Sequence, residues 1–162
     1  MSFDLGKKLA AGGFILVLIR IPLNAIGLAA IPTIIGVISM LSVAGGFAMM
    51  WLTGGNILHL GIGGLYAVGF IVSLLFPSAW IITGIASILY ILVWAFKRFS
   101  DGDMTGAVML GGAAVLTLAS SFILDFLIRL GLALSVVSVV SLLITLAAVG
   151  IKTLMALSES EK

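Results

Sequence analysis

Six apolar stretches, each about as long as a membrane-crossing helix, constrain this chain more than any other feature of its sequence. Charged and turn-forming residues separate the stretches. A transmembrane α-helix needs about 20 consecutive, mostly apolar residues. We therefore predict six transmembrane helices, over residues 6–26, 30–52, 57–76, 79–97, 104–124 and 131–155.

The predicted breaks between these helices differ in character. Thr53-Gly54-Gly55-Asn56 is a turn signal, Pro77-Ser78 closes the third stretch, and Ser100-Asp101-Gly102-Asp103 is the most hydrophilic loop. Residues 125–129 are expected to form the next break, and residues 158–162 a polar tail. No strongly polar segment separates the first two stretches.

The composition supports the same class of protein. Of the 162 residues, 62% are hydrophobic and 9% are charged, and the mean hydropathy is +1.39. A soluble domain carries roughly a quarter charged residues, so a water-soluble fold could not hide this much apolar surface. The predicted fold is an all-α, polytopic membrane bundle that forms one transmembrane domain over residues 1–162.

The basic residues predict an orientation in the membrane. With six crossings both termini lie on one side, together with Lys7, Lys8, Lys97, Arg98, Lys152 and Lys162. Arg20 and Arg129 then fall on the other side. Because basic residues favour the cytoplasmic side, we expect both termini in the cytoplasm of a multi-pass protein of the cell membrane. The net charge of +2 is small, and no nucleic-acid partner is expected.

Glycine pairs suggest an internal repeat. Gly12-Gly13, Gly63-Gly64 and Gly111-Gly112 recur at spacings of about 50 residues, and each pair lies near the start of an odd-numbered stretch. A period of this length is typical of a repeated helical hairpin. We predict three tandem hairpins, over about residues 6–56, 57–103 and 104–156.

Small and hydroxyl-bearing residues predict close contacts between helices. Small residues four apart occur at Ala44/Ala48, Gly63/Ala67 and Ala107/Gly111, and such pairs let helices approach closely in lipid. The last stretch carries a polar stripe on one third of its surface. This stripe is expected to face another helix, or to line a hydrophilic path, and consists of Ser135, Ser138, Ser141 and Thr145.

Ionisable residues inside a membrane are costly and therefore functional candidates. Asp125 and Arg129 are four residues apart and share a helical face, either as an interfacial pair or as a buried one. If Arg20 lies deep, Asp125 is its candidate acid, which would give a cluster of Arg20, Asp125 and Arg129. Lys152 lies near the end of the last stretch and is expected to extend toward the cytoplasmic headgroups.

His59, the only histidine, is predicted near the cytoplasmic end of the third stretch. It could ligate haem, contact a quinone headgroup or relay protons, or simply form hydrogen bonds at headgroup level. The chain has no cysteine, which excludes disulfides and thiolate chemistry, and one histidine cannot form a His-rich metal site within this chain. Common enzymatic motifs are absent, so neither an enzyme nor a bound cofactor is predicted.

Two functions fit these features. The first is a non-catalytic accessory subunit of a larger membrane assembly, such as a respiratory complex. The second is a small oligomeric transporter or channel, with a path lined by the Ser/Thr stripe and by Arg20, Asp125 and Arg129. The expected partners are the lipid bilayer and other membrane subunits, or further copies of this chain.

Overall fold

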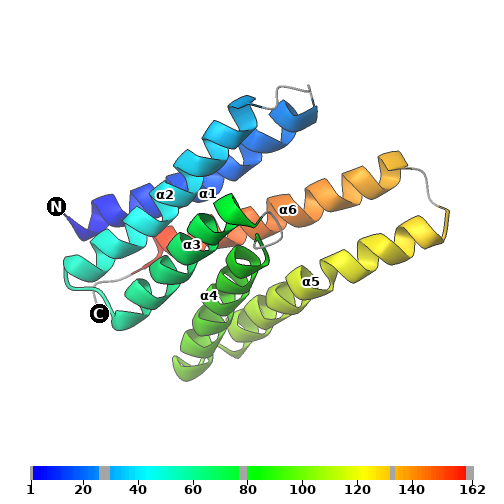
Figure 1. Cartoon of the computed structure of the whole chain (residues 1–162). Coiled ribbons are helices and arrows are strands. Elements are labelled where there is room, and N and C mark those ends of the chain that lie inside the picture. The colour runs from blue at the N-terminus through cyan, green and yellow to red at the C-terminus, as the bar shows by residue number, and fades with distance from the viewer. Residues whose placement is uncertain (1, 26–29, 77–79, 132–133, 160–162) are drawn as a thin grey trace. The chain divides into compact units, whose positions relative to one another are not determined.

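The computed structural model is all-α and describes residues 2–25, 30–76, 80–131 and 134–159. Within these residues the chain forms six α-helices (Figure 1). They are α1 (Phe3–Ala25), α2 (Ala30–Leu52), α3 (Ile57–Leu75), α4 (Trp80–Ser100), α5 (Met104–Arg129) and α6 (Leu134–Leu157). The predicted breaks at residues 77–78 and just before Ala30 lie outside the described residues.

Four of these helices are long and apolar enough to cross a membrane, judged by length and composition. The crossing segments are Ala30–Leu52, Ile57–Leu75, Ile81–Ser100 and Ser135–Leu157. In α5 the apolar segment Met104–Ala119 is shorter. The described residues thus give an all-α protein with several membrane-spanning helices, as predicted.

The predicted break at residues 125–129 is wrong, because α5 continues through Arg129. Asp125 and Arg129 end the apolar stretch, but neither residue type breaks a helix. The helix ends just beyond them, where Gly131 has a φ of +73° and its N–H bonds to the carbonyl of Ile128 at 3.0 Å. A glycine in the left-handed region is a common helix stop, because it has no Cβ to clash.

Two loops are formed as their sequences predict. Gly54, in the turn after α2, has a φ of +109°, and the Asn56 side chain caps α3 by accepting from the N–H of Leu58 at 3.1 Å. Gly102, after α4, has a φ of +82°. Asp103 then caps α5 by accepting from the N–H of Gly106 at 2.8 Å. These caps satisfy amide groups that the helices themselves leave unpaired.

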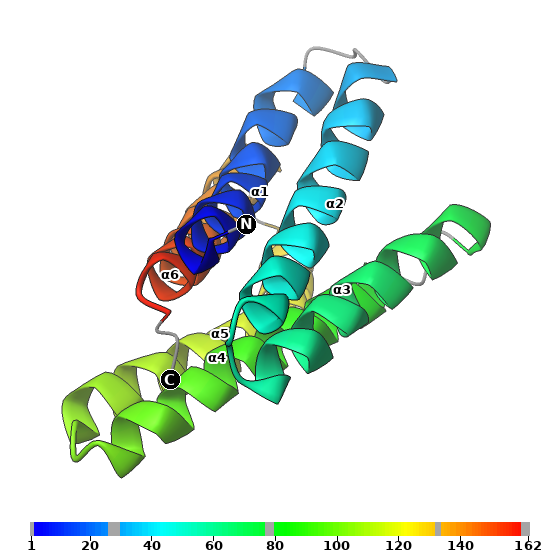
Figure 2. The same cartoon turned by 90° about the vertical axis from the view of Figure 1, so that its left-hand side faces the viewer.

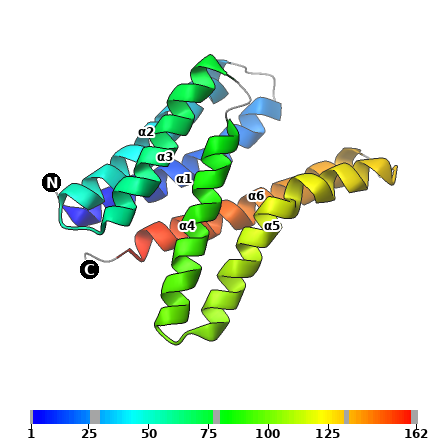
Figure 3. The same cartoon turned by 60° about the horizontal axis from the view of Figure 1, so that its bottom comes forward.

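The chain divides into two compact units, residues 1–87 with 149–162, and residues 88–148. The first unit contains α1, α2, α3, the start of α4 and the end of α6. In it α1 lies beside α2, and α2 beside α3 (Figures 1 and 2). The second unit contains the rest of α4, all of α5 and the start of α6, and a short loop at residues 101–103 joins α4 to α5 (Figure 3).

Glycines bring α1 and α2 into close contact. A Cβ on Gly13 would lie 2.8 Å from the carbonyl oxygen of Ser39, and one on Gly46 would lie 2.5 Å from the backbone nitrogen of Ala10. At this short separation the hydroxyl of Ser39 donates to the carbonyl of Gly13 at 2.7 Å. Backbone approach and interhelical hydrogen bonds hold helices together where lipid removes the hydrophobic drive.

The small-residue pairs Ala44/Ala48 and Gly63/Ala67 face each other across α2 and α3, whereas in the third predicted pair, Ala107/Gly111, a Cβ on Gly111 would meet no atom within 4 Å. A Cβ on Gly63 would lie 2.8 Å from the Cβ of Phe47 and 3.3 Å from the carbonyl oxygen of Ala44. In each of the first two glycine pairs one glycine makes such a contact and its neighbour does not, since Gly12 and Gly64 meet no atom within 4 Å. The three-hairpin repeat stays a prediction.

Candidate functional site

A lysine, a serine and a tyrosine meet inside the first unit. The Tyr66 hydroxyl lies 2.7 Å from Ser87 Oγ, and Lys152 Nζ donates to the same oxygen at 3.2 Å. Ser87 Oγ donates in turn to the carbonyl of Thr83 at 3.0 Å. The only hydroxyl proton of Ser87 is donated to the Thr83 carbonyl. The two lone pairs on Ser87 Oγ can therefore accept hydrogen bonds from Tyr66 and Lys152. We call Tyr66, Ser87 and Lys152 the polar cluster.

Two members of the polar cluster are buried, Tyr66 at the middle of α3 and Ser87 on α4, and Lys152 on α6 is half-buried. Tyr66 is 1% exposed and Ser87 8%. The Lys152 ammonium also lies 5.1 Å from the centre of the Phe14 ring, close enough for a cation–π contact. Among the described residues no carboxylate pairs with this ammonium. It contacts the Ser87 hydroxyl and the face of the Phe14 ring instead.

The position of Lys152 differs from the expected extension toward the headgroups. A side chain on an α-helix leans toward the helix N-terminus. Because Lys152 lies near the C-terminal end of α6, this lean directs its ammonium back along the helix to Ser87 on α4. The geometry of the helix therefore favours the interior contact over the nearer interface.

Aromatic rings connect the polar cluster to His59. The Phe47 ring stacks on the Tyr66 ring with the ring centres 6.3 Å apart. The same Phe47 ring stacks on the His59 ring, with those centres also 6.3 Å apart. Phe3 meets the histidine ring edge-on at 5.8 Å. Gly55 leaves room for the imidazole, because a Cβ there would lie 2.7 Å from Nδ1. Packing from α1, α2 and α3 thus fixes the histidine ring.

His59 also binds the tail that follows α6. Its Nε2 lies 3.1 Å from Glu159 Oε2, and the two side chains are 6% and 9% exposed. Its Nδ1 lies 3.1 Å from the carbonyl oxygen of Asn56. Both ring nitrogens therefore face oxygens, whereas a neutral imidazole has one N–H. A neutral ring donates from one of these nitrogens, and which oxygen receives that hydrogen bond depends on the tautomer. We call His59 and Glu159 the tail contact.

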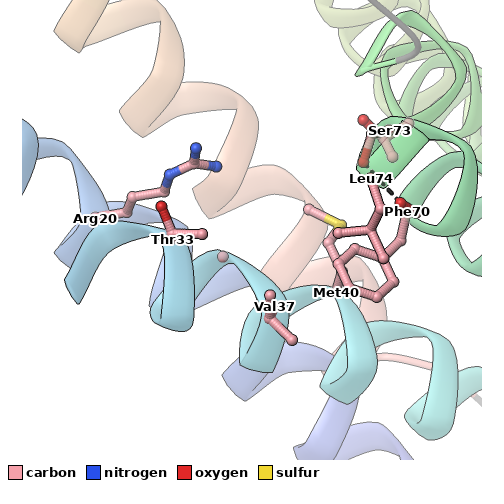
Figure 4. Close-up of a pocket in the computed structure, with 9 residues that line it drawn as sticks. Arg20, Thr33, Val37, Met40, Phe70, Ser73 and Leu74 are labelled. Atoms are coloured by element: carbon pink, nitrogen blue, oxygen red, sulfur yellow. Dashed lines mark hydrogen bonds between the residues drawn. The ribbon is translucent and has the colours of Figure 1, made fainter. Parts of the chain in front are cut away.

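The other predicted site residues are distributed over both units. Arg20 is exposed near the end of α1, in the first unit, and lines a cavity of about 490 Å³ (Figure 4). Arg129 is exposed at the end of α5, in the second unit. Asp125 lies in α5, but its side chain is outside the described residues. The cluster of Arg20, Asp125 and Arg129 stays a prediction.

The hydroxyl stripe lies on the part of α6 that belongs to the second unit. Ser135 and Ser138 are exposed, and Ser141 and Thr145 are half-buried. Thr145 donates to the carbonyl of Ser141 at 2.9 Å. In the described part of the chain the hydroxyls of Ser135, Ser138 and Ser141 make no hydrogen bond.

Sequence reasoning selected His59 but missed Tyr66, Ser87 and Glu159, and placed Lys152 elsewhere. The signal that could have found the lysine is its charge within an apolar helix. Tyr66 and Ser87 carry no such signal, because only the packing of α3 on the start of α4 brings them together. Among the described residues no group of three or more His, Cys, Asp or Glu side chains could hold a metal ion.

Comparisons with protein families, with curated proteins and with solved structures find no match. The class of the protein therefore rests on its own helices. By their length and apolar composition the chain is a multi-pass membrane protein.

Proposed function

We propose that this protein is a non-catalytic accessory subunit of a larger membrane assembly, and that α6 contacts a neighbouring chain. The observation that carries the proposal is the α6 stripe, in which Ser135 and Ser138 are exposed and make no hydrogen bond among the described residues. An unsatisfied hydroxyl in hydrocarbon is unfavourable. A polar helix face of another subunit would supply the missing partners.

The burial of the helices supports the same proposal. Within the second unit, the start of α6 leaves Ser135, Ser138 and Val139 exposed. The exposed serines lie next to exposed apolar side chains such as Leu142, so the face offers both apolar contacts and hydroxyl groups to a neighbouring helix. A respiratory complex is one assembly in which a small subunit of this kind would fit.

The topology we propose has six crossings, three helical hairpins and both termini in the cytoplasm. Phe3 and Glu159, near the two ends of the chain, both contact His59, which supports an even number of crossings. Reporter fusions at Asp101 and at Ser158 should both report the cytoplasm. Opposite sides for these two positions would contradict the six-crossing topology.

The polar cluster favours a second candidate, a small oligomeric transporter or channel. A lysine ammonium, a tyrosine and a serine at mid-membrane depth could contact a solute that crosses the bilayer. The hydroxyl stripe, with Arg20, Asp125 and Arg129, would then line the path. This alternative needs several copies of the chain and no other subunit.

One experiment separates the two candidates. The protein is extracted from its native membrane in mild detergent and run on a native gel, and co-migrating proteins are identified by mass spectrometry. An accessory subunit should migrate with a reproducible set of other membrane proteins. Migration alone, or as a homo-oligomer, would contradict the subunit proposal and favour transport, which flux measurements in vesicles would then test.

A further inference from the structure

A cavity of about 490 Å³ lies within the first unit, at the opposite end from the tail contact (Figure 4). Its walls come from the end of α1, the start of α2, the end of α3 and the start of α4. Cavities that bind small ligands typically measure about 300–1,000 Å³. The size therefore suits a ligand rather than a trapped water molecule.

Arg20 provides a permanent positive charge at this cavity. In the part of the chain that the structure describes, no carboxylate pairs with its guanidinium. Gly36 gives it space, because a Cβ at that position would lie 3.2 Å from Nη1. A guanidinium has five N–H donors arranged to bind phosphate or carboxylate with two parallel hydrogen bonds.

Another polar feature of the cavity also favours an anion. Thr33 lies in the first turn of α2, toward the Arg20 end of the cavity (Figure 4). Helix N-termini carry a partial positive charge. Ser73 lies toward the opposite end, beside Leu74, and its hydroxyl donates to the carbonyl of Phe70 at 2.7 Å (Figure 4).

The rest of the cavity wall is apolar and continues onto the exposed surface. Figure 4 shows Arg20 and Thr33 toward one end, and Met40, Phe70 and Leu74 toward the other. Leu74 is 64% exposed. A ligand that matches this wall needs an anionic head and an apolar tail.

We propose that this cavity binds an anionic phospholipid, with the phosphate group on Arg20 and an acyl chain along Met40, Phe70 and Leu74. The position of Arg20 along α1 suits contact with a lipid headgroup. It lies about 8 Å before the end of the helix, at 1.5 Å per residue. An arginine at that depth reaches the headgroup layer with its long side chain. This lipid site does not depend on the accessory-subunit proposal, because it belongs to the chain alone.

The test uses purified protein in neutral detergent and native mass spectrometry. Dioleoyl phosphatidylglycerol and dioleoyl phosphatidylcholine are added at equal concentrations, with inorganic phosphate as a separate competitor. Wild-type protein should retain phosphatidylglycerol preferentially. Arg20→Gln should lower that binding about tenfold, which is the effect of losing one interaction of about 1.4 kcal/mol. Arg98→Gln, at an exposed arginine near the end of α4, is the matched control and should bind as wild type does.

A second variant keeps the charge and removes the space. Val37 lines the cavity, so Val37→Phe should weaken phosphatidylglycerol binding while Arg20 remains. Equal retention of both lipids by wild type, or unchanged binding in Arg20→Gln, would overturn the proposal. Displacement of phosphatidylglycerol by millimolar phosphate would also overturn it, because the site would then belong to a free anion.

Discussion

The interior of the first unit and the exposed stripe of α6 differ in whether their polar side chains have hydrogen-bond partners. In the first unit, Ser39, Tyr66, Ser87 and Lys152 each bind a partner from another helix. On α6, Ser135 and Ser138 are exposed and, in the described residues, unpaired. A polar group in lipid needs a partner. The first region supplies its partners from its own helices, and in our proposal the second receives them from another chain.

The largest effect should come from disrupting the contact between α1 and α2. Gly13→Ala would place a Cβ 2.7–2.8 Å from Val43 and from the Ser39 carbonyl, so the helices must separate and the Ser39 hydrogen bond is lost. We expect a destabilisation of about 1–3 kcal/mol, typical of overpacking, seen as a lower melting temperature in detergent.

The adjacent glycine provides the control for that experiment. A Cβ on Gly12 would meet no atom within 4 Å, and alanine also favours the helix over glycine. Gly12→Ala should therefore leave the melting temperature unchanged or raise it slightly. Equal losses in the two variants would mean that the close contact of α1 with α2 does not stabilise the protein.

The next effect concerns the polar cluster. Ser87→Ala would remove the hydroxyl oxygen that accepts hydrogen bonds from both Tyr66 and Lys152. Both donors would then lose this acceptor. We expect a destabilisation of about 1–2 kcal/mol, measured by thermal unfolding in detergent, because Tyr66 is fully buried but Lys152 is only half-buried. Lys152→Met removes the charge but keeps a similar shape, and should change stability by less than about 1 kcal/mol.

The two variants also separate structure from function. If Lys152→Met lost more stability than Ser87→Ala, Ser87 would not be the residue on which the hydrogen bonds of the polar cluster depend. If Lys152→Met is stable but abolishes flux in vesicles, the cluster serves transport rather than packing.

A smaller, local effect is expected at the tail contact. Glu159→Ala should release the residues after α6, whereas Glu159→Gln should hold them, because an amide N–H can donate to a neutral His59 ring. The chain has no cysteine, so a Ser158→Cys background reports the tail by its rate of maleimide labelling. Labelling should accelerate in the alanine variant alone. Equal rates in both variants would show that Glu159 does not hold the tail.

The smallest effect is expected at Asp4, near the start of α1. Its carboxylate lies 2.6 Å from Lys8 Nζ, and this hydrogen bond and charge hold the pKa of Asp4 below its ordinary value of 3.8. A lowered carboxyl pKa stabilises the fold above the unfolded-state pKa, and the contribution is lost as the pH falls through the folded-state value. Both groups are exposed, so Asp4→Asn should leave the melting temperature at neutral pH unchanged within error. A clear drop would show that this pair is buried by something other than the chain itself.

The helices and turns followed from the sequence because their causes are local. An apolar stretch between polar breaks defines a span, and Gly54, Asn56, Gly102 and Asp103 form the turns and caps that their residue types favour. The exception at residues 125–129 has a local cause too. Charge marks the end of an apolar stretch, whereas the helix ends only at the next glycine.

The candidate site could not be derived in the same way. Ser87 and Lys152 are 65 residues apart, and Tyr66 and Ser87 are 21 apart, so their meeting depends on how the helices pack. Glu159 was assigned to a polar tail, and no pattern near it indicates His59 as its partner. The α6 stripe was visible from sequence because its spacing on one helix defines it.

The central claim is that α6 faces another chain through its hydroxyl stripe. The most direct measurement places a photoreactive amino acid at position 138 in the native membrane, and at position 143 as a control. Leu143 is 60% exposed and lies about 140° around the helix from Ser138, at 100° per residue. The account predicts a crosslink to a different membrane protein from position 138 and none from position 143. Crosslinks to lipid alone from both positions would contradict it.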